Sequence, residues 1–397
     1  MRILFINGLY EPYVGGGAEI TLHKLTRGLM SLGHQVAVLS IGDNVGLCID
    51  RVDGVKVYRA GIRNLYFPHG NKTPSPLSRT AWHLLDCYNP LMQDYVRTVV
   101  DAEKPEVSSC HNLAGWSVSA WDALSDCGVP IVQVLHDQYL LCPTSTMFDG
   151  HSPCQKQCLR CRTLRLPHAG KSNQVSAVVG VSRFILDKLL SYGYFRDTPI
   201  RQVIYNARTL DAAFHHSRER AVGGRRVFGF IGTLAPQKGI EMLLDSFSQC
   251  TEAGWRLIVA GTGRSGYEAE LKKRYRNENI SFAGYSSPMD FFEKIDICVV
   301  PSLWEDTFPG VVLESLSMGV PVIGSERGGI PEMLQNGYNG LLFNPGDPHG
   351  LASAMRRMSE GLDSWPLHRA GIVKSSLPFS DGYGWSKQWE NVYAGVV

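Results

Sequence analysis

Acidic residues flank a predicted strand-to-helix turn in the segment ICVVPSLWEDTFPGVVLE, residues 297–314. The apolar run 297–300 is typical of a buried parallel strand, and a helix containing Glu314 is predicted after Pro309 and Gly310. Backbone N–H groups and the helix dipole favour an anion at such a helix start. Carboxylates accept hydrogen bonds from sugar hydroxyls. An anion and a polyol at one place indicate a nucleotide sugar as the ligand.

A glycine-rich loop near the N-terminus is a second candidate anion site. Residues 2–8 are predicted as a strand, the loop GLYEPYVGGGAE follows, and an apolar-periodic helix is predicted over 20–32. Gly15, Gly16 and Gly17 would let a ligand approach backbone N–H groups, as phosphate-binding loops do. A flexible turn is the alternative. The sequence GGGAE is not the G-x-G-x-x-G fingerprint, which argues against a dehydrogenase.

Strand and helix patterns alternate along the first half, which predicts a parallel sheet with crossover helices. The predicted strands are 35–40, 55–59, 107–110, 129–135, 177–181 and 203–205, with helical patterns over 78–102 and 117–127. Ligands of such sheets bind at the carboxyl ends of the strands. His111 and His136 each follow a predicted strand, and His136 is the better candidate for a functional side chain.

A second alternating series follows a polar, aperiodic segment at 207–226, which is predicted as a linker. Its predicted strands are 227–231, 256–260, 280–283, 297–300, 320–324 and 341–343. A chain of 397 residues is also long enough for two hydrophobic cores. We therefore predict two Rossmann-like domains, over 1–206 and 227–379.

The composition excludes several classes of protein. With 44% hydrophobic residues, 19% charged residues and a formal net charge of +2, the chain is a globular protein rather than a basic nucleic-acid binder, so no nucleic-acid partner is expected. The apolar N-terminal run is too short for a signal peptide, and no later stretch reaches transmembrane length. We expect a cytoplasmic protein, with peripheral contact at the inner face of a membrane, and cysteines that are reduced.

One loop carries both cysteines and basic residues. The short spacing in CQKQCLRC is that of thiolate zinc sites, but its x3 and x2 gaps are not a standard pattern, so structural zinc is the minor alternative to free thiols. The four cysteines are Cys142, Cys154, Cys158 and Cys161. Residues 156–171 include five Lys or Arg and no acid. This is either a solvated loop or a patch for a phosphate-bearing acceptor or anionic lipid, near surface aromatics such as Trp82 and Tyr88.

Ordered motifs along both halves resemble the retaining GT-B glycosyltransferases of family 4, also called glycosyltransferase group 1. The C-terminal motifs are FIGTLAPQKGI (230–240), VAGTG (259–263), FAGY (282–285), the 297–314 segment, MGVPVIGSERGGIPEML (318–334) and NGYNGLLFNPGD (336–347). The N-terminal motifs are GGAE (16–19), HNLAGWS (111–117) and LHDQYLLCP (135–143). The resemblance covers nearly the full length.

This resemblance implies an α/β protein of the GT-B fold, with two facing Rossmann-like domains and a cleft between them. The domain over 1–206 would bind the acceptor, and the domain over 227–379 the nucleotide sugar. A last helix within 380–397 would pack back on the first domain. The donor would be a UDP-, GDP- or dTDP-sugar, the acceptor a glycan or lipid-linked hydroxyl, and no cofactor or metal would be required.

The resemblance also implies roles for individual residues. Lys238 would neutralise the diphosphate, together with the amides of Gly16 and Gly17. Glu314 would bind the ribose hydroxyls, and His136 would lie beside the donor sugar. Other nucleotide-sugar contacts are implied for Gly232, Thr233, Tyr285, Phe308, Pro309, Gly310 and Val311, with Tyr285 near the base.

Two positions depart from the family pattern. The first acid of the Glu-x7-Glu spacing falls on Asp306, one residue after Glu305, and either acid would orient the donor hexose. The arginine that usually precedes the lysine by five residues is Thr233 here. Arg327 or Arg183 is a candidate replacement on the basis of charge alone.

The resulting hypothesis is a metal-independent, retaining transfer of a hexose, with leaving-group stabilisation as the main catalytic contribution. Such a reaction would serve cell-surface polysaccharide or glycolipid synthesis. A GT-B nucleotide-sugar epimerase is one alternative, although no acid and base for it are evident. A non-catalytic glycan-binding or assembly subunit is another, and Thr233 is the residue that motivates it.

Overall fold

The chain folds into two compact α/β units in the computed structural model, which describes residues 1–70, 74–208, 226–250, 252, 254–361 and 369–397. The first unit comprises Met1–Met147, Gln155–Asn206 and Gly382–Val397. The second comprises Phe148–Cys154 and Ala207–Asp381. Most of the linker predicted over 207–226 lies outside the described residues. The prediction of two domains with parallel sheets is confirmed.

The first unit is built on a sheet that has eight strands within the described residues, in the order β3-β4-β2-β1-β5-β6-β7-β8. All neighbours are parallel except β3 and β4. The strands are β1 (Arg2–Ile6), β2 (Gln35–Gly42), β3 (Leu47–Val52), β4 (Val55–Gly61), β5 (Val107–Cys110), β6 (Ile131–Leu135), β7 (Ala177–Gly180) and β8 (Ile200–Val203). The prediction missed β3 because this edge strand is largely exposed and lacks a buried apolar face. It also placed β8 at 203–205, too late in the chain.

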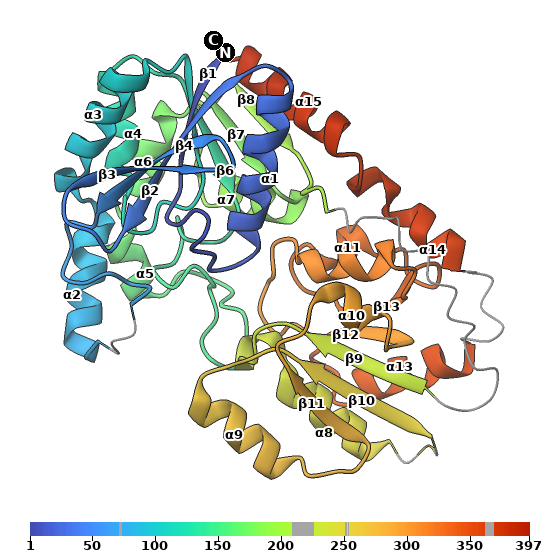
Figure 1. Cartoon of the computed structure of the whole chain (residues 1–397). Coiled ribbons are helices and arrows are strands. Elements are labelled where there is room, and N and C mark those ends of the chain that lie inside the picture. Colours follow the sequence, from blue (N-terminus) through green and yellow to red (C-terminus); the bar gives the residue numbers. More distant parts are fainter. Residues whose placement is uncertain (71–73, 209–225, 251, 253, 362–368) are drawn as a thin grey trace. The chain divides into compact units, whose positions relative to one another are not determined.

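Helices cover both faces of this sheet (Figure 1). They are α1 (Gly17–Ser31), α2 (Pro76–Cys87), α3 (Gln93–Glu103), α4 (Ser119–Asp126), α5 (Leu159–Leu164), α6 (His168–Lys171), α7 (Arg183–Ser191) and α15 (Gly382–Ala394), with short 3-10 turns η1 (Pro90–Met92) and η2 (Ser172–Gln174). The single helical pattern predicted over 78–102 is wrong, because the structure divides it into α2 and α3. Pro90 disfavours helical geometry at Asn89, whose side chain instead accepts from the Leu91 N–H.

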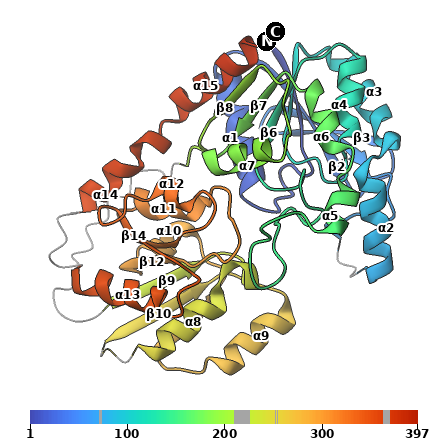
Figure 2. The same cartoon turned by 180° about the vertical axis from the view of Figure 1, so that it is seen from behind.

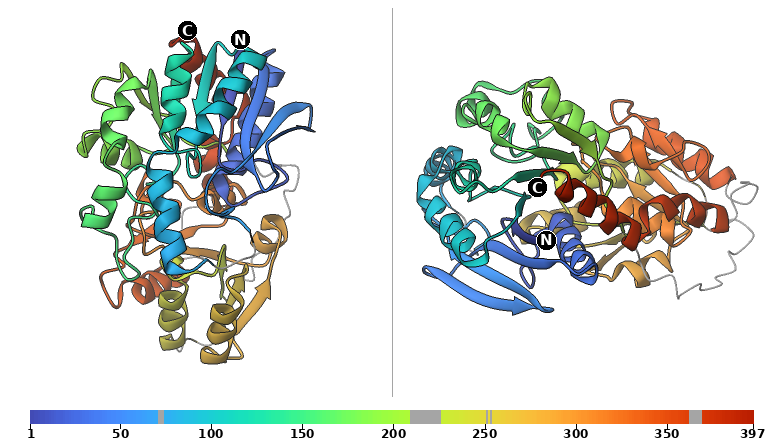
Figure 3. Two further views of the ribbon diagram at one scale, coloured as in Figure 1. Left: turned by 90° about the vertical axis from the view of Figure 1, so that its left-hand side faces the viewer. Right: turned by 90° about the horizontal axis from the view of Figure 1, so that it is seen from above.

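The last helix, α15, packs on α1, the first helix of the chain (Figures 1 and 3). Gly28 of α1 leaves space for Ser386, because a Cβ at this glycine would lie 2.1 Å from the Ser386 Oγ. At the end of the contact, the His34 Nε2 and the Glu390 Oε1 are 2.9 Å apart. Trp389 and Tyr393 are fully buried against the first unit. The last helix is therefore part of the first unit's core.

The second unit has a parallel sheet in the order β11-β10-β9-β12-β13-β14. Figure 2 labels β14, β12, β9 and β10 of this sheet. Its strands are β9 (Arg226–Ile231), β10 (Trp255–Ala260), β11 (Ile280–Gly284), β12 (Ile297–Val300), β13 (Val322–Ser325) and β14 (Gly340–Phe343). Its helices are α8 (Ile240–Gln249), α9 (Ser265–Arg274), α10 (Pro288–Phe292), α11 (Gly310–Ser317), α12 (Ile330–Met333), α13 (Gly350–Gly361) and α14 (Arg369–Ser376), with 3-10 turns η3 (Pro236–Lys238) and η4 (Leu377–Phe379). Phe228, Trp255 and Met355 belong to the apolar core of this unit.

The strand order determines where each unit can bind a ligand. In doubly wound sheets the ligand site lies outside the carboxyl ends of the strands where the order reverses. That reversal lies between β1 and β5 in the first unit and between β9 and β12 in the second. The glycine-rich loop follows β1. The loop that carries Lys238 follows β9, and the loop that carries Glu305 and Asp306 follows β12. The topology therefore brings the predicted segments to the two switch points.

Gly239 holds two of these loops together. Its φ of 72° lies in the left-handed region, and a Cβ there would lie 1.8 Å from the carbonyl oxygen of Pro301. The amide of Leu303 then donates to the Gln237 carbonyl at 2.9 Å. Only glycine permits this close approach without a backbone shift.

We expect Gly239→Ala to lower the free energy of unfolding by about 2 kcal/mol or more, because the new Cβ meets backbone and takes a positive φ. Urea denaturation followed by tryptophan fluorescence measures this. Gly266→Ala in α9 is the matched control, since a Cβ there meets nothing within 4 Å. Equal stabilities for the two variants would show that the Gly239 contact is not needed.

Candidate functional site

The ion pair between Lys238 and Asp306 is the centre of the candidate site in the second unit. The Lys238 Nζ lies 2.6 Å from the Asp306 Oδ2, and the Asp306 side chain is only 9% exposed. Lys238 ends the turn η3 after β9, and Asp306 lies on the loop after β12. The ammonium also lies 4.9 Å from the centroid of the Trp304 ring. Two loops at the switch point thus hold one cation in place.

The same loop leads into the predicted helix, α11, which begins at Gly310, slightly earlier than predicted. Glu314, one turn into this helix, has its Oε1 3.9 Å from a guanidinium nitrogen of Arg208. The Arg208 side chain is mostly buried, and burial lowers its pKa, although the nearby Glu314 charge opposes that shift. A Cβ at Gly310 would lie 2.8 Å from the Arg208 Nε. The guanidinium group of Arg208 therefore lies against Gly310, the first residue of α11.

Sequence reasoning missed Arg208, because it lies at the edge of the segment interpreted as a linker. Its backbone amide donates to the Phe379 carbonyl at 2.9 Å, which fixes it beside α11. Of the two arginines suggested on charge, Arg327 belongs to the second unit, in the loop after β13, and Arg183 begins α7 in the first unit. The buried Arg327 Nε has no hydrogen-bond partner among the described residues. An unpaired guanidinium nitrogen favours a bound anion.

Glycine geometry brings Arg327 close to the acid loop. Gly328 has a φ of 57°, and a Cβ there would lie 2.0 Å from the Asp306 carbonyl oxygen. The amide of Gly329 donates to that oxygen at 2.8 Å. The motif SERGG is therefore packed on the backbone of the ion-paired aspartate.

The remaining residues implied for nucleotide-sugar binding differ in exposure. Thr233 and Tyr285 are exposed, Tyr285 to 84%, whereas Phe308 and Pro309 are buried. The Phe308 ring lies 5.9 Å from that of Phe379. Phe308 thus packs its own loop, between β12 and α11, against Phe379. Gly232, Gly310 and Val311 are partly exposed.

The glycine-rich loop of the first unit has an internal partner. The Gly16 N–H donates to the Glu19 Oε2 at 2.8 Å, so the Glu19 carboxylate caps the start of α1. Burial raises the pKa of Glu19, although hydrogen bonds to Gly16 and Asn7 oppose this. An anion that binds the Gly16 amide must displace this carboxylate. Gly17 is the first residue of α1.

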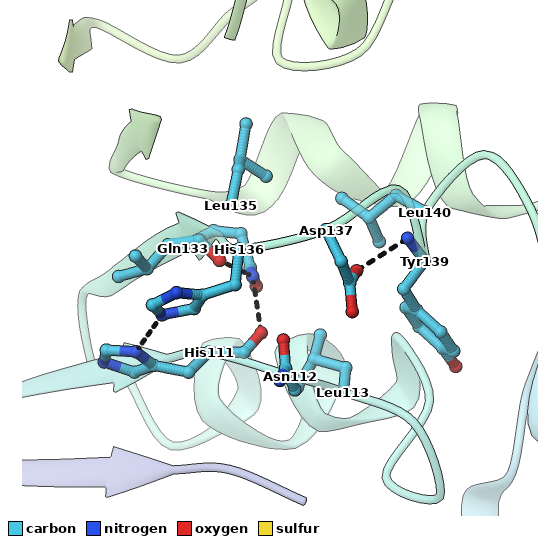
Figure 4. Close-up of a pocket in the computed structure, with 10 residues that line it drawn as sticks. His111, Asn112, Leu113, Gln133, Leu135, His136, Asp137, Tyr139 and Leu140 are labelled. Carbon is cyan, nitrogen blue, oxygen red and sulfur yellow. Dashed lines mark hydrogen bonds between the residues drawn. The ribbon is translucent and has the colours of Figure 1, made fainter. Parts of the chain in front are cut away.

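His136 lies in a small pocket at the carboxyl end of β6, with room for about one water molecule. Figure 4 shows its ring beside that of His111, which follows β5. The His111 Nδ1 and the His136 Nε2 are 2.8 Å apart, and the rings are stacked. Gln133 donates to the His111 carbonyl at 2.9 Å. Sequence reasoning therefore chose one member of a histidine pair.

Burial governs the titration of this pocket. It lowers the pKa of His136 to about 4, and it lowers the pKa of His111 well below its usual value, with the neighbouring His136 adding to the shift. Burial also raises the pKa of Asp137 to about 6, although the Tyr139 amide donates to this carboxylate. Both imidazoles are therefore neutral at pH 7. A neutral imidazole donates one hydrogen bond and accepts another.

Three of the four cysteines lie together in the first unit. The Cys161 thiol donates to the Cys142 sulfur at 3.6 Å, which lowers the pKa of Cys142. The Cys158 sulfur accepts from the Cys161 amide, and Cys154 belongs to the second unit. No group of three His, Cys, Asp or Glu among the described residues is arranged to hold a metal ion. Structural zinc stays a prediction without geometric support.

The basic loop 156–171 is only partly solvated. Arg165 is buried at 2% exposure, 3.5 Å from the Asp86 carboxylate, and Lys171 donates to Asp122 at 2.8 Å. The expectation that Trp82 is a surface aromatic is wrong, since it is buried and donates to the Tyr66 carbonyl. The exposed basic residues of the loop are Lys156, Arg160 and Arg162.

Two family models together match most of the chain. The model of "Glycosyltransferase Family 4" matches residues 15–211, and that of "Glycosyl transferases group 1" matches residues 225–360. An uncharacterised 42.6 kDa protein in the cps region of Klebsiella pneumoniae is 29% identical over 334 residues, which cover 84% of this chain and 87% of that protein.

Solved structures have the same fold. Sucrose-phosphate synthase of Thermosynechococcus elongatus superposes with a TM-score of 0.77 at 16% identity, over 99% of this chain and 98% of that one. Alr3699/HepE of Anabaena in complex with UDP-glucose gives 0.70 at 20% identity, over 100% of both chains. In addition, no helix among the described residues has the length and apolar character to cross a membrane.

The depressed pKa of His136 can be measured directly. We expect its imidazole to stay neutral in the folded protein until the pH falls to about 4, whereas in urea it titrates near the ordinary value of about 6.5. The folded state then binds fewer protons than the unfolded state between these values, so this group's contribution to stability is lost as the pH falls through that window. Histidine NMR chemical shifts against pH report the midpoint. A folded-state midpoint above 6 would contradict the burial argument.

Proposed function

Because the chain is a glycosyltransferase of the family 4, GT-B type, we propose that it transfers a hexose, with retention, from a nucleoside diphosphate sugar to a hydroxyl of a glycan or lipid-linked acceptor. The observation that supports this best is the Lys238–Asp306 ion pair beside the start of α11. It fixes a cation where a leaving diphosphate would need one. Cell-surface polysaccharide or glycolipid synthesis is the process that such a transfer would serve.

The proposed diphosphate site uses three cations of the second unit. Lys238 supplies an ammonium with three donors, of which Asp306 uses one. Arg327 supplies a buried Nε that lacks a partner among the described residues, and Arg208 lies against Gly310 at the start of α11. These two arginines replace the charge that the family pattern places at Thr233. The helix dipole of α11 adds a further favourable contribution.

Glu314 is proposed to bind the ribose. A carboxylate accepts from both vicinal hydroxyls of a ribose. Its side chain is 17% exposed, so a ligand can reach part of it, and Arg208 lies 3.9 Å away to hold it. The bound UDP-glucose of HepE supports a nucleotide sugar as the donor class.

In the proposed reaction the acceptor oxygen attacks the anomeric carbon on the face from which the diphosphate leaves. The glycosidic C–O electron pair passes to the diphosphate, whose growing charge Lys238 and the two arginines stabilise. A diphosphate oxygen takes the acceptor proton. His136 is neutral at pH 7. It therefore acts on the donor sugar as a neutral hydrogen-bond donor and not as a positively charged imidazolium.

The two acids of the loop have different proposed tasks. Asp306 is buried and bonded to Lys238, so it aims the ammonium. Glu305 is the acid that we assign to the hydroxyls of the hexose. An Asp306→Asn change should then add little to Lys238→Ala in the double variant, because the two residues act as one unit, whereas Glu305→Gln should add to it. If Asp306→Asn and Glu305→Gln each lowered the kcat/KM of Lys238→Ala by the same factor as that of the unmodified protein, this division of tasks would be wrong.

The non-catalytic and epimerase alternatives are separated by one assay. Purified protein is incubated with UDP-, GDP- and dTDP-sugars, with and without glycan and polyprenyl phosphate acceptors. Acceptor-dependent release of nucleoside diphosphate supports a transferase. A new sugar stereoisomer indicates an epimerase, and binding without turnover indicates a binding subunit.

We expect Lys238→Ala to raise the activation free energy measured by kcat/KM by about 2–4 kcal/mol, because the leaving group loses a preorganised cation. Affinity for free nucleoside diphosphate should also fall, which isothermal titration calorimetry measures.

Lys273→Ala is the matched control, since this lysine of α9 is exposed. Unchanged kinetics for Lys238→Ala would remove this residue from the mechanism.

The first unit, which we propose binds the acceptor, has a surface suited to an anionic membrane. Leu159 and Leu166 are 77% and 80% exposed and lie on or next to α5, as do the exposed Lys156, Arg160 and Arg162. Exposed leucines insert at the acyl boundary, and basic side chains pair with lipid phosphates. We propose that this leucine and arginine surface of α5 meets the membrane that carries the acceptor.

We expect the protein to bind vesicles of phosphatidylglycerol at low salt and to lose binding at high salt, because lipid attraction of basic residues is screened. Arg160→Glu with Arg162→Glu should weaken binding by about tenfold or more, at roughly 1 kcal/mol for each basic side chain. Cosedimentation measures this. The control pair, Lys273→Glu with Arg276→Glu in the second unit, should bind normally. An equal loss of vesicle binding in both double variants would show that the α5 surface is not the membrane-binding surface.

A further inference from the structure

A buried chain of hydrogen bonds runs from the last helix to His136. The hydroxyl of Tyr393, on α15, donates to the Ser109 Oγ at 3.0 Å. The Ser109 Oγ lies 3.1 Å from the His111 Nε2, and the His111 Nδ1 lies 2.8 Å from the His136 Nε2. All four residues belong to the first unit. The chain thus links residue 393 to a histidine at the carboxyl end of β6.

One direction gives every proton of this chain an acceptor within it. The Tyr393 hydroxyl donates to Ser109, so the Ser109 oxygen is an acceptor there. With the Ser109 proton directed to its other partner in the chain, the His111 Nε2 accepts. The neutral His111 then carries its proton on Nδ1 and donates to the His136 Nε2. In that arrangement His136, also neutral, carries its own proton on Nδ1.

The surroundings keep this arrangement in place. Ser109 and Tyr393 are fully buried, and His111 is 3% exposed, so water does not compete for these bonds. The Phe5 ring packs against both Tyr393 and His111, at centroid distances of 6.2 and 5.6 Å. Such packing favours one rotamer for each ring. Figure 4 shows the His111–His136 hydrogen bond among the residues that line the pocket.

We propose that Tyr393 is a positioning residue that, through Ser109 and His111, holds His136 in the tautomer with its proton on Nδ1. This proposal rests on the proposed function, in which His136 donates a hydrogen bond to the donor sugar. The Nδ1–H would be the donating group. Without the chain, His111 and His136 can exchange to the opposite tautomers, and only a fraction of molecules would present the competent form.

The test uses Tyr393→Phe, which removes the hydroxyl and keeps the ring against Phe5 and Trp389. Nitrogen-15 NMR of histidine-labelled protein reports the tautomer of each imidazole without any substrate. We expect a single Nδ1–H form of His136 in the unmodified protein and a mixture in the variant. We expect kcat to fall by about 3- to 10-fold, as the competent fraction falls, while the KM for the donor changes little.

Two further variants keep the test specific. Ser109→Ala breaks the same chain at its next link, so it should reproduce the effect, and the double variant should add nothing. Tyr58→Phe is the matched control, because this buried tyrosine donates instead to Glu103 at 2.5 Å, outside the chain. It should leave the His136 tautomer and kcat unchanged.

The outcomes separate the two proposals. An unchanged tautomer in Tyr393→Phe, or a loss of kcat that Tyr58→Phe shares, would overturn the positioning role. A tautomer change in a protein that transfers no sugar would support the hydrogen-bond chain and reject the proposed function.

Discussion

The ion pair of Lys238 with Asp306 is the interaction on which the second unit's candidate site depends. An ammonium can be aimed only if a neighbouring group keeps its long side chain from sampling other rotamers, and a largely buried carboxylate at 2.6 Å does so. The pair itself requires two loops at the ends of β9 and β12 to approach closely. That approach is possible because residue 239 has no side chain. Charge placement therefore follows from backbone packing.

Much of the fold was predictable because parallel strands buried on both faces appear as continuous apolar runs. The strands β5 and β12 were predicted at their observed bounds. The strand β3 was not, since an exposed edge strand lacks that signal. The division of α2 from α3 depends on Asn89 and Pro90, a local stop within a continuous helical pattern.

The candidate site was predictable where it lies in motifs, and much less where it depends on tertiary contacts. Lys238, Glu314 and His136 were proposed from the resemblance and from their places after strands, and they stay predictions. Arg208 was missed, because nothing in the local sequence shows that it lies against Gly310. The burial of Arg165 beside Asp86 is also a tertiary outcome that spacing does not reveal.

The packing of α15 on α1 also constrains how the chain reaches its folded state. The first unit's core is completed by Trp389 and Tyr393, which are synthesised only after the second unit. Domains commonly fold from the N-terminus as they are synthesised, but here the first unit's residues before 207 lack the cover of α15 until the second unit has been made. The described residues of the second unit lie within Phe148–Cys154 and Ala207–Asp381, so all of them are synthesised before α15. It can therefore complete its fold before the unit that precedes it in the chain.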